Sequence, residues 1–288
     1  MLRFVLRGVP IVNKLPDTSK VKARLTTAFH RNVFAAVIQS FEQYDNPLRV
    51  NNFATGLREL TRLVLDYYAP EKSITASPWF VEEKNEYGKV VITRAQRMKY
   101  AIQAGLPDDF VASLLVDVPE TIRVFKDLTE RMNKLTHVTE ETFGIDGYAA
   151  DRFAGIALET FNLLLETIDD CRSELRKEVE DRAREALTEE LMESTVDALD
   201  EIATHYQINE AHIDDLHVEH MGPDEIVFKA SGTVDCMLQY GSDSDVSKDI
   251  GMRVNDNYPL TCEFVADIST PMDLKVRKLH VDNSSFYE

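Results

Sequence analysis

The sequence predicts an α+β protein, with an all-helical N-terminal domain over residues 1–208 and a small antiparallel β domain over residues 209–288. Two observations predict this division. Apolar residues recur at helical spacings along most of the first part, whereas short β-branched runs alternate with polar residues and turn signals in the second. Because helices and strands occupy separate parts of the chain instead of alternating, the pattern disfavours a parallel α/β architecture.

Two helices are expected in the first 68 residues, after a short strand or irregular arm at residues 2–12. The first covers residues 20–44, where apolar residues recur at steps mainly of four. The second covers residues 51–68 and carries Arg58 and Arg62 on one side, because they are four residues apart. This pair either makes ion pairs with nearby carboxylates or contacts the phosphates of a nucleic acid.

A less regular segment, residues 71–92, separates these helices from a basic one. Its end, residues 89–93, is rich in β-branched residues and is expected to form a short strand. The helix that follows has Thr93 as its N-cap and Gly105 as its stop. Arg94 and Arg97 make it the most basic short helix of the chain. A further short helix is expected over residues 107–115.

The stretch from residue 123 to residue 143 is the richest in groups able to do chemistry. We expect a helix here that carries Arg131, Asn133, Lys134 and His137 toward its end. Asn133 and His137 are four residues apart, which predicts that they project from one helical face. Arg131 and His137 are six apart, so they can meet where the helix ends near residue 135 or where a second subunit supplies one of them.

A long helical tract is expected over residues 148–206, with strands from residue 212 onward. Two groups of side chains in the strand region are candidate metal sites. The histidines near residues 205–220 do not have the spacing of a compact zinc motif. The acidic segment 241–251 lacks the glycine and the terminal glutamate of a calcium-binding loop, which favours a solvated turn. We therefore predict no metal ion and no cofactor.

Charge is distributed unevenly along the chain, although the formal net charge is −18. Residues 1–68 carry ten Lys and Arg against five Asp and Glu, whereas residues 138–288 carry 12 against 35. Phosphate affinity depends mainly on Lys and Arg. A nucleic-acid site is therefore expected within the first 137 residues, while the acidic remainder either keeps the protein in solution or docks a partner protein.

Compartment and chemistry are further limited by what the sequence lacks. Its three cysteines are far apart, which favours a reducing compartment over a disulfide framework. No apolar run approaches the length of about 20 residues that spans a bilayer, so a cytoplasmic protein without a membrane partner is expected. The motifs of P-loop, dinucleotide-binding and serine-esterase proteins are missing, and those activities lose their usual support.

The helical domain resembles the HEPN superfamily of all-helical proteins, many of which are metal-independent ribonucleases. The family signature is an Arg, then four to six residues with a polar one near the start, then His. Arg131 and His137 here have five residues between them, with Asn133 second. In addition, NNFATGLRELTRLVL, TRAQRMKYAIQAGL and NKLTHVTEETF resemble predicted nucleases that associate with PIWI-like proteins of bacterial defence loci.

The resemblance implies an endoribonuclease effector of a bacterial antiviral or toxin system, with its site formed across a homodimer. Arg131 would hold the phosphate, His137 would act as acid or base, and Asn133 would orient the site. RNA, or another nucleic acid, would be guided by basic residues: Arg58, Arg62, Arg94, Arg97 and Lys134. The alternative is a non-catalytic interaction or sensor module that docks a partner protein of the same system through its acidic helix and β domain.

Overall fold

The computed structural model describes residues 18–287, so the arm predicted at residues 2–12 lies outside the described part. The chain forms two compact units. The helical unit comprises Met1–Glu71, Val91–Ile102 and Asp117–Asp169. The sheet unit comprises Lys72–Val90, Gln103–Val116 and Asp170–Glu288. Helices fill the first part of the chain and antiparallel strands the last, which confirms the α+β class.

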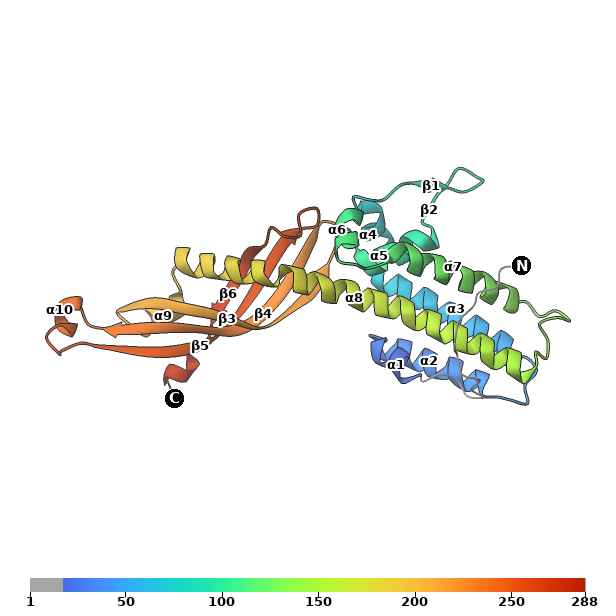
Figure 1. Cartoon of the computed structure of the whole chain (residues 1–288), viewed down its shortest axis with the longest axis horizontal. Helices are drawn as coiled ribbons and strands as arrows, with labels where there is room; N and C mark the ends of the chain where they lie inside the picture. Colours follow the sequence, from blue (N-terminus) through green and yellow to red (C-terminus); the bar gives the residue numbers. More distant parts are fainter. Residues whose placement is uncertain (1–17, 288) are drawn as a thin grey trace. The chain divides into compact units, whose positions relative to one another are not determined.

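The helical unit is built from α1 (Ser19–Arg24), α2 (Ala28–Phe41), α3 (Arg49–Tyr68), α5 (Arg94–Gln103), α7 (Val118–Leu135) and the first part of α8 (Gly147–Glu193). In Figure 1, α2 lies beside α3, and α3 also packs on α7. Four phenylalanines from α2, α3, α7 and α8 are completely buried and form the centre of the core: Phe41, Phe53, Phe125 and Phe161.

The helix predicted over residues 20–44 is in fact two helices, so this prediction is wrong in detail. Leu25 follows α1 with an extended backbone, φ −74° and ψ 114°, which ends the helix. Thr27 then caps α2, because its side-chain oxygen accepts a hydrogen bond from the backbone N–H of His30 at 3.0 Å. Apolar residues at four-residue steps continue across the break, which is why periodicity alone does not show it.

The helix α5 begins as its sequence predicts. The Thr93 hydroxyl accepts from the backbone N–H of Gln96 at 3.2 Å, and the Gln96 side chain accepts from the N–H of Thr93 at 2.9 Å. This reciprocal capping box fixes the first turn. Three of its side chains are buried in the core: Met98, Tyr100 and Ile102.

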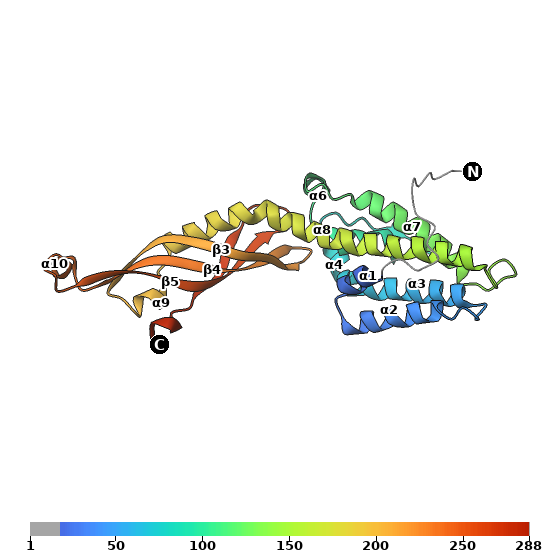
Figure 2. The same ribbon diagram turned by 60° about the horizontal axis from the view of Figure 1, so that its bottom comes forward.

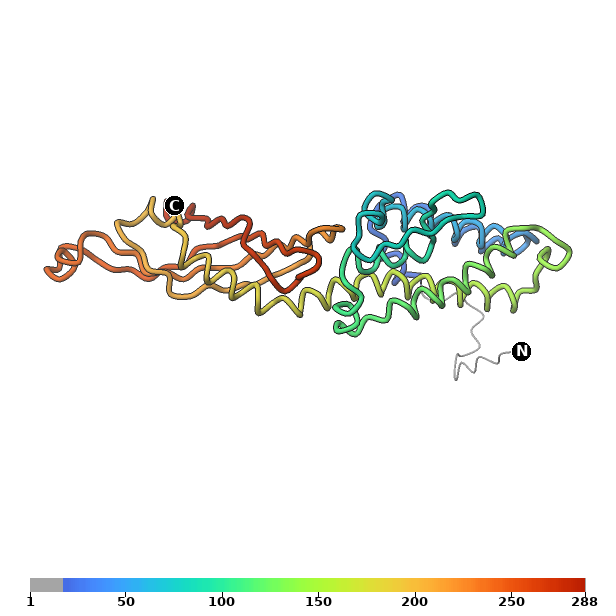
Figure 3. Tube along the Cα trace, turned by 90° about the horizontal axis from the view of Figure 1, so that it is seen from above, coloured from blue at the N-terminus to red at the C-terminus, as the bar shows by residue number. Residues whose placement is uncertain are grey.

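The sheet unit contains four antiparallel strands in the order β3 (His205–Met221), β4 (Glu225–Tyr240), β5 (Met252–Asp267) and β6 (Lys275–Val281). Figures 2 and 3 show the second part of α8 along one face of this sheet. That part of α8 buries one residue every four positions, which gives a continuous apolar stripe: Cys171, Leu175, Val179, Ala183, Leu187 and Leu191. The sheet begins at His205, four residues before the predicted boundary, while the division at residue 208 stays a prediction.

Smaller elements complete the described chain. They are α4 (Glu71–Ala76), the two-stranded pair β1 (Glu83–Lys84) and β2 (Val90–Val91), α6 (Asp108–Ser113), α9 (Asp197–Asp200), α10 (Asp243–Val246) and the 3-10 turn η1 (Ser284–Tyr287). The strand expected at residues 89–93 is present but is only two residues long. Across residues 18–287, no helix is both long enough and apolar enough to cross a bilayer.

Candidate functional site

The end of α7 places three of the predicted site residues on the surface of the helical unit. The Asp117 side chain caps the start of α7 by accepting from the N–H of Glu120 at 3.0 Å. An apolar stripe that includes Phe125 and Met132 anchors the helix in the core. The solvent-facing side of the last turns carries three exposed side chains: Arg131, Asn133 and Lys134.

The predicted common helical face of Asn133 and His137 is wrong, because α7 ends at Leu135. Thr136 is the C-cap, and its N–H donates to the carbonyl of Met132 at 2.9 Å. His137 follows the helix as an exposed residue whose carbonyl accepts from the Thr142 hydroxyl at 2.7 Å. The helix therefore ends between Arg131 and His137, which is the condition under which the two could meet within one chain. In the described structure, however, their side chains make no hydrogen bond to each other.

Asn51 of α3 holds the end of α7 and was not predicted as a functional residue. Its side-chain N–H donates to the carbonyl of Leu135 at 2.8 Å, which satisfies one of the free carbonyls of the last turn. Asn51 is buried, and its own Oδ1 accepts no hydrogen bond from the described part of the chain. The signal in the sequence is weak, since it consists of one amide at the start of an otherwise apolar helical face.

Arg58 joins the arginines of α3 to the end of α7. Its Nη1 lies 3.4 Å from the Oδ1 of Asn133, and its Nη2 lies 3.8 Å from a carboxylate oxygen of Glu59. The first contact brings together a residue predicted to bind nucleic acid and a residue predicted to act in catalysis. Seventy-five positions separate the two in the sequence, so helical spacing alone does not predict the contact.

Arg62 and Arg97 are each held between two carboxylates. Arg62 lies 3.0 Å from Glu59 and 2.8 Å from Asp66, and hydrogen bonding to Glu59 raises the pKa of Arg62. Arg97 contacts the same Asp66 at 3.5 Å and also pairs with Glu71. For Arg62 the structure thus shows the ion-pair alternative, and the charge of both arginines is largely balanced.

Arg94 differs from these two arginines. It is the first residue of α5, and it makes no ion pair with any residue in the range 18–287. Partial loss of hydration and the positive charge of Arg58 lower the pKa of Arg94. A pocket of about 450 Å³ lies between α3 and α5 and is lined by Arg62, Leu65, Asp66, Glu71, Ile92, Arg94 and Arg97.

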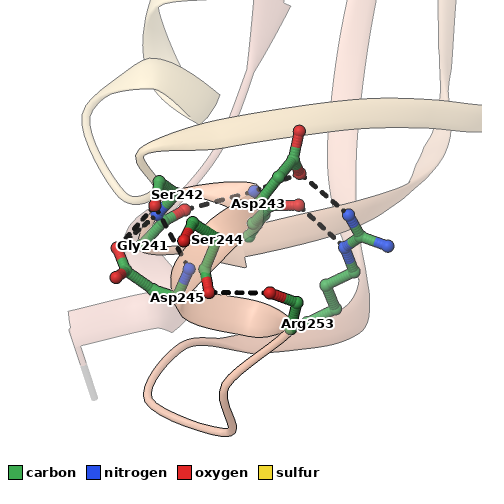
Figure 4. Close-up of polar contacts among 8 residues, drawn as sticks. Gly241, Ser242, Asp243, Ser244, Asp245 and Arg253 are labelled. Carbon is green, nitrogen blue, oxygen red and sulfur yellow. Dashed lines mark hydrogen bonds and ion pairs between the residues drawn. The ribbon is translucent and has the colours of Figure 1, made fainter.

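The side chains of the acidic segment after β4 form hydrogen bonds within the segment and with the neighbouring strands, as Figure 4 shows. The Ser242 side chain accepts from the N–H of Asp245, and the Asp245 carboxylate accepts from the N–H of Ser242 in return. One oxygen of Asp243 accepts from Arg253 at 3.0 Å and from Gln239 at 3.1 Å. The segment is thus an exposed turn, as predicted, in which the carboxylates of Asp243 and Asp245 accept hydrogen bonds from protein donors.

Two histidines of β3, His212 and His217, likewise lie near carboxylates. His217 lies 3.1 Å from Asp215, and His212 lies 3.7 Å from Asp235. Over residues 18–287, no group of three or more His, Cys, Asp or Glu side chains has an arrangement suited to a metal ion.

Two family models match the chain, and both are described as predicted pPIWI-associating nuclease. One matches residues 22–161 and the other matches residues 168–287. The chain matches this nuclease family in both of its halves. No curated protein and no solved structure matches the chain. The matches confirm the resemblance to predicted pPIWI-associating nucleases, while membership of the HEPN superfamily stays a prediction.

The two matches follow the change from helix to strand. The first covers α2, α3, α5 and α7, and it therefore includes every predicted site residue of this pPIWI-associating nuclease-like chain. The second begins within α8 and includes the whole four-stranded sheet. Both models carry the same nuclease description, so the matches do not assign the activity to either unit.

Proposed function

We propose that the chain is a metal-independent endoribonuclease that acts as the effector of a bacterial antiviral or toxin system. The observation that carries this proposal is the contact between Arg58 and Asn133. It connects the arginines of α3 to the end of α7, where Arg131 and Lys134 are exposed and His137 follows. A nuclease needs cations for the phosphate beside a group that transfers protons, and this end of α7 offers both.

The roles follow from the chemistry of each side chain. Arg131 holds the scissile phosphate and the charge that develops on it, because a guanidinium binds phosphate through parallel N–H donors. His137 transfers a proton, since histidine is the side chain that most often serves as a general acid or base. Asn133, which Arg58 contacts, orients the substrate. The ribose 2′-hydroxyl of RNA serves as the nucleophile, so the reaction needs no metal-bound water.

A homodimer completes the site in this proposal. HEPN-like sites commonly form across two subunits, and Arg131 and His137 of one chain make no hydrogen bond to each other, although both are described. A second copy would bring its own Arg131 or His137 to the first. Light scattering after size exclusion should then give about twice the mass of the 32.8 kDa chain.

The description of the matched families also names an association with pPIWI proteins. We propose that this chain docks such a partner through its acidic half, because residues 138–288 carry 35 acidic against 12 basic side chains. If cleavage is absent and a partner co-purifies, the chain is instead a non-catalytic interaction module.

Cleavage of a labelled single-stranded RNA tests the enzymatic proposal. We expect the wild-type protein to cleave with and without a chelator, and we expect His137→Ala to lower the rate at least about 100-fold, which is typical of losing a general acid or base. His30→Ala is not a suitable control because His30 is buried, so exposed His280→Ala serves as the matched control. Equal cleavage by His137→Ala and the wild type would remove the assigned mechanism.

A further inference from the structure

The pocket between α3 and α5 contains one arginine whose charge the protein leaves unbalanced. Three of its lining residues are arginines, and two are carboxylates, Asp66 and Glu71. Asp66 forms ion pairs with both Arg62 and Arg97, and Glu71 forms one with Arg97. Arg94 receives no carboxylate from residues 18–287, although it lines the same pocket.

The charge beside Arg94 is positive as well. Arg58 lies one helical turn before Arg62 on α3 and has only a loose contact with Glu59, at 3.8 Å. Glu59 is itself bound more closely by Arg62, at 3.0 Å. Arg58 is not among the residues that line the pocket, but its positive charge acts on Arg94 and helps to lower the pKa of that arginine. A bound anion would offset this repulsion.

Both guanidinium groups start from well-fixed backbone. Arg94 is the first residue of a ten-residue helix whose start is held by the Thr93 and Gln96 capping box. The free N–H groups at such a helix start add partial positive charge to the same place. Arg58 stands in the middle of α3 and is further held by Asn133. The contact with Asn133 already restricts the Arg58 side chain, which lowers the entropic cost of binding a phosphate there.

We propose that Arg94, with Arg58 beside it, binds one phosphate group of a nucleic-acid strand in this pocket. This subsite rests on the proposed nuclease function, and it positions the strand whose scissile phosphate reaches the end of α7. The half-buried Ile92 in the pocket wall gives the sugar or base next to that phosphate an apolar surface to contact. Arg62 and Arg97 support the pocket through their ion pairs and do not hold the phosphate.

The test measures binding of a strand that cannot be cleaved. A fluorescent 2′-O-methyl RNA of about 12 nucleotides, within the usual site size, is titrated with the full chain, and anisotropy is followed at several salt concentrations. We expect Arg94→Gln and Arg58→Gln each to weaken binding at least about tenfold. Their salt dependence should also fall by about 0.7 in the logarithmic slope, because one phosphate contact is lost.

Arg62→Gln is the matched control, since it removes the same charge from the same pocket but from a residue already held by two carboxylates. We expect it to weaken binding less than about threefold, in line with the small worth of exposed ion pairs. Arg94→Lys should recover part of the lost affinity, because it keeps the charge without the guanidinium fork. Circular dichroism melting of each variant verifies that the fold is intact.

Two versions of the strand identify the source of the phosphate. One strand carries a 5′-phosphate and the other does not. If Arg94→Gln weakens binding only of the 5′-phosphorylated strand, the pocket binds a strand end. If it weakens binding of both strands, the pocket binds an internal phosphodiester. The proposal is overturned if Arg94→Gln binds as tightly as the wild type, if Arg62→Gln weakens binding equally, or if the wild type does not bind. The cleavage assay with His137→Ala is independent of these results, so a failed subsite and a failed nuclease are distinguishable.

Discussion

At the scale of single residues, burial of a titratable side chain makes the stability of the fold depend on pH. His30 of α2 is 5% exposed and meets Tyr67 edge-on, with 5.7 Å between the ring centroids. Burial lowers the pKa of His30 below its ordinary value of 6.5. The unfolded chain therefore takes up this proton first as the pH falls, and the folded state loses stability.

This gives a prediction for the unfolding free energy of the helical unit. As the pH falls through 6.5 toward the lower pKa of His30 in the folded state, the wild type should lose stability relative to His30→Leu, which has no proton to take up. Urea unfolding followed by circular dichroism at several pH values measures the difference. Curves that stay parallel from neutral to acidic pH would show that His30 does not contribute.

The arginines show what can and what cannot be predicted from the sequence at this scale. The four-residue spacing of Arg58 and Arg62 correctly predicts one side of one helix. Arg62 pairs with Glu59 and Asp66 at helical spacings of three and four, which the sequence also indicates. The contact of Asp66 with Arg97 of another helix joins residues that are distant in the sequence, so local spacing does not predict it.

At the scale of secondary structure, helix ends determine the candidate site. The apolar stripe of α7 correctly predicts a helix, but its end at Leu135 separates His137 from the face of Asn133. The sequence after Leu135 is Thr-His-Val-Thr, which has neither glycine nor proline to mark a stop. Asn51 supplies the missing stop signal from α3 by binding the carbonyl of Leu135.

The pairing of β3 with β4 depends on one glycine. Gly232 lies opposite Ile213, next to an irregularity in β3, and a Cβ added at Gly232 would lie 1.9 Å from the carbonyl oxygen of His212. No side chain fits there without moving the backbone of β3. The close approach of the two strands therefore requires glycine.

We accordingly expect Gly232→Ala to lower the unfolding free energy of the sheet unit by at least about 2 kcal/mol. Exposed Ser231→Ala is the control and should change it by less than about 0.5 kcal/mol. Trp79 belongs to the sheet unit and donates to the carbonyl of Ala104 at 2.7 Å, so its fluorescence during urea unfolding provides the measurement. Equal stability of Gly232→Ala and the wild type would refute the close approach.

At the scale of the whole molecule, the segregation of charge agrees with the place of the candidate site. The predicted site residues all belong to the helical unit, whereas the acidic excess falls after residue 137. The fold class follows from the separation of helical and β-branched patterns along the chain. Which segments belong to each unit cannot be predicted from those patterns. Residues 72–90 and 103–116 belong to the sheet unit through contacts such as the hydrogen bond from the backbone N–H of Gly105 to the carbonyl of Gly222.

In the proposed mechanism, the helical unit cleaves RNA by attack of the ribose 2′-hydroxyl, with His137 moving the proton. Mass spectrometry of the products of RNA cleavage in the presence of a chelator distinguishes this mechanism from a metal-dependent one. We expect fragments that end in a 2′,3′-cyclic phosphate or a 3′-phosphate, with a 5′-hydroxyl on the other fragment. Products with a 3′-hydroxyl and a 5′-phosphate, formed only when a divalent metal ion is added, would contradict it.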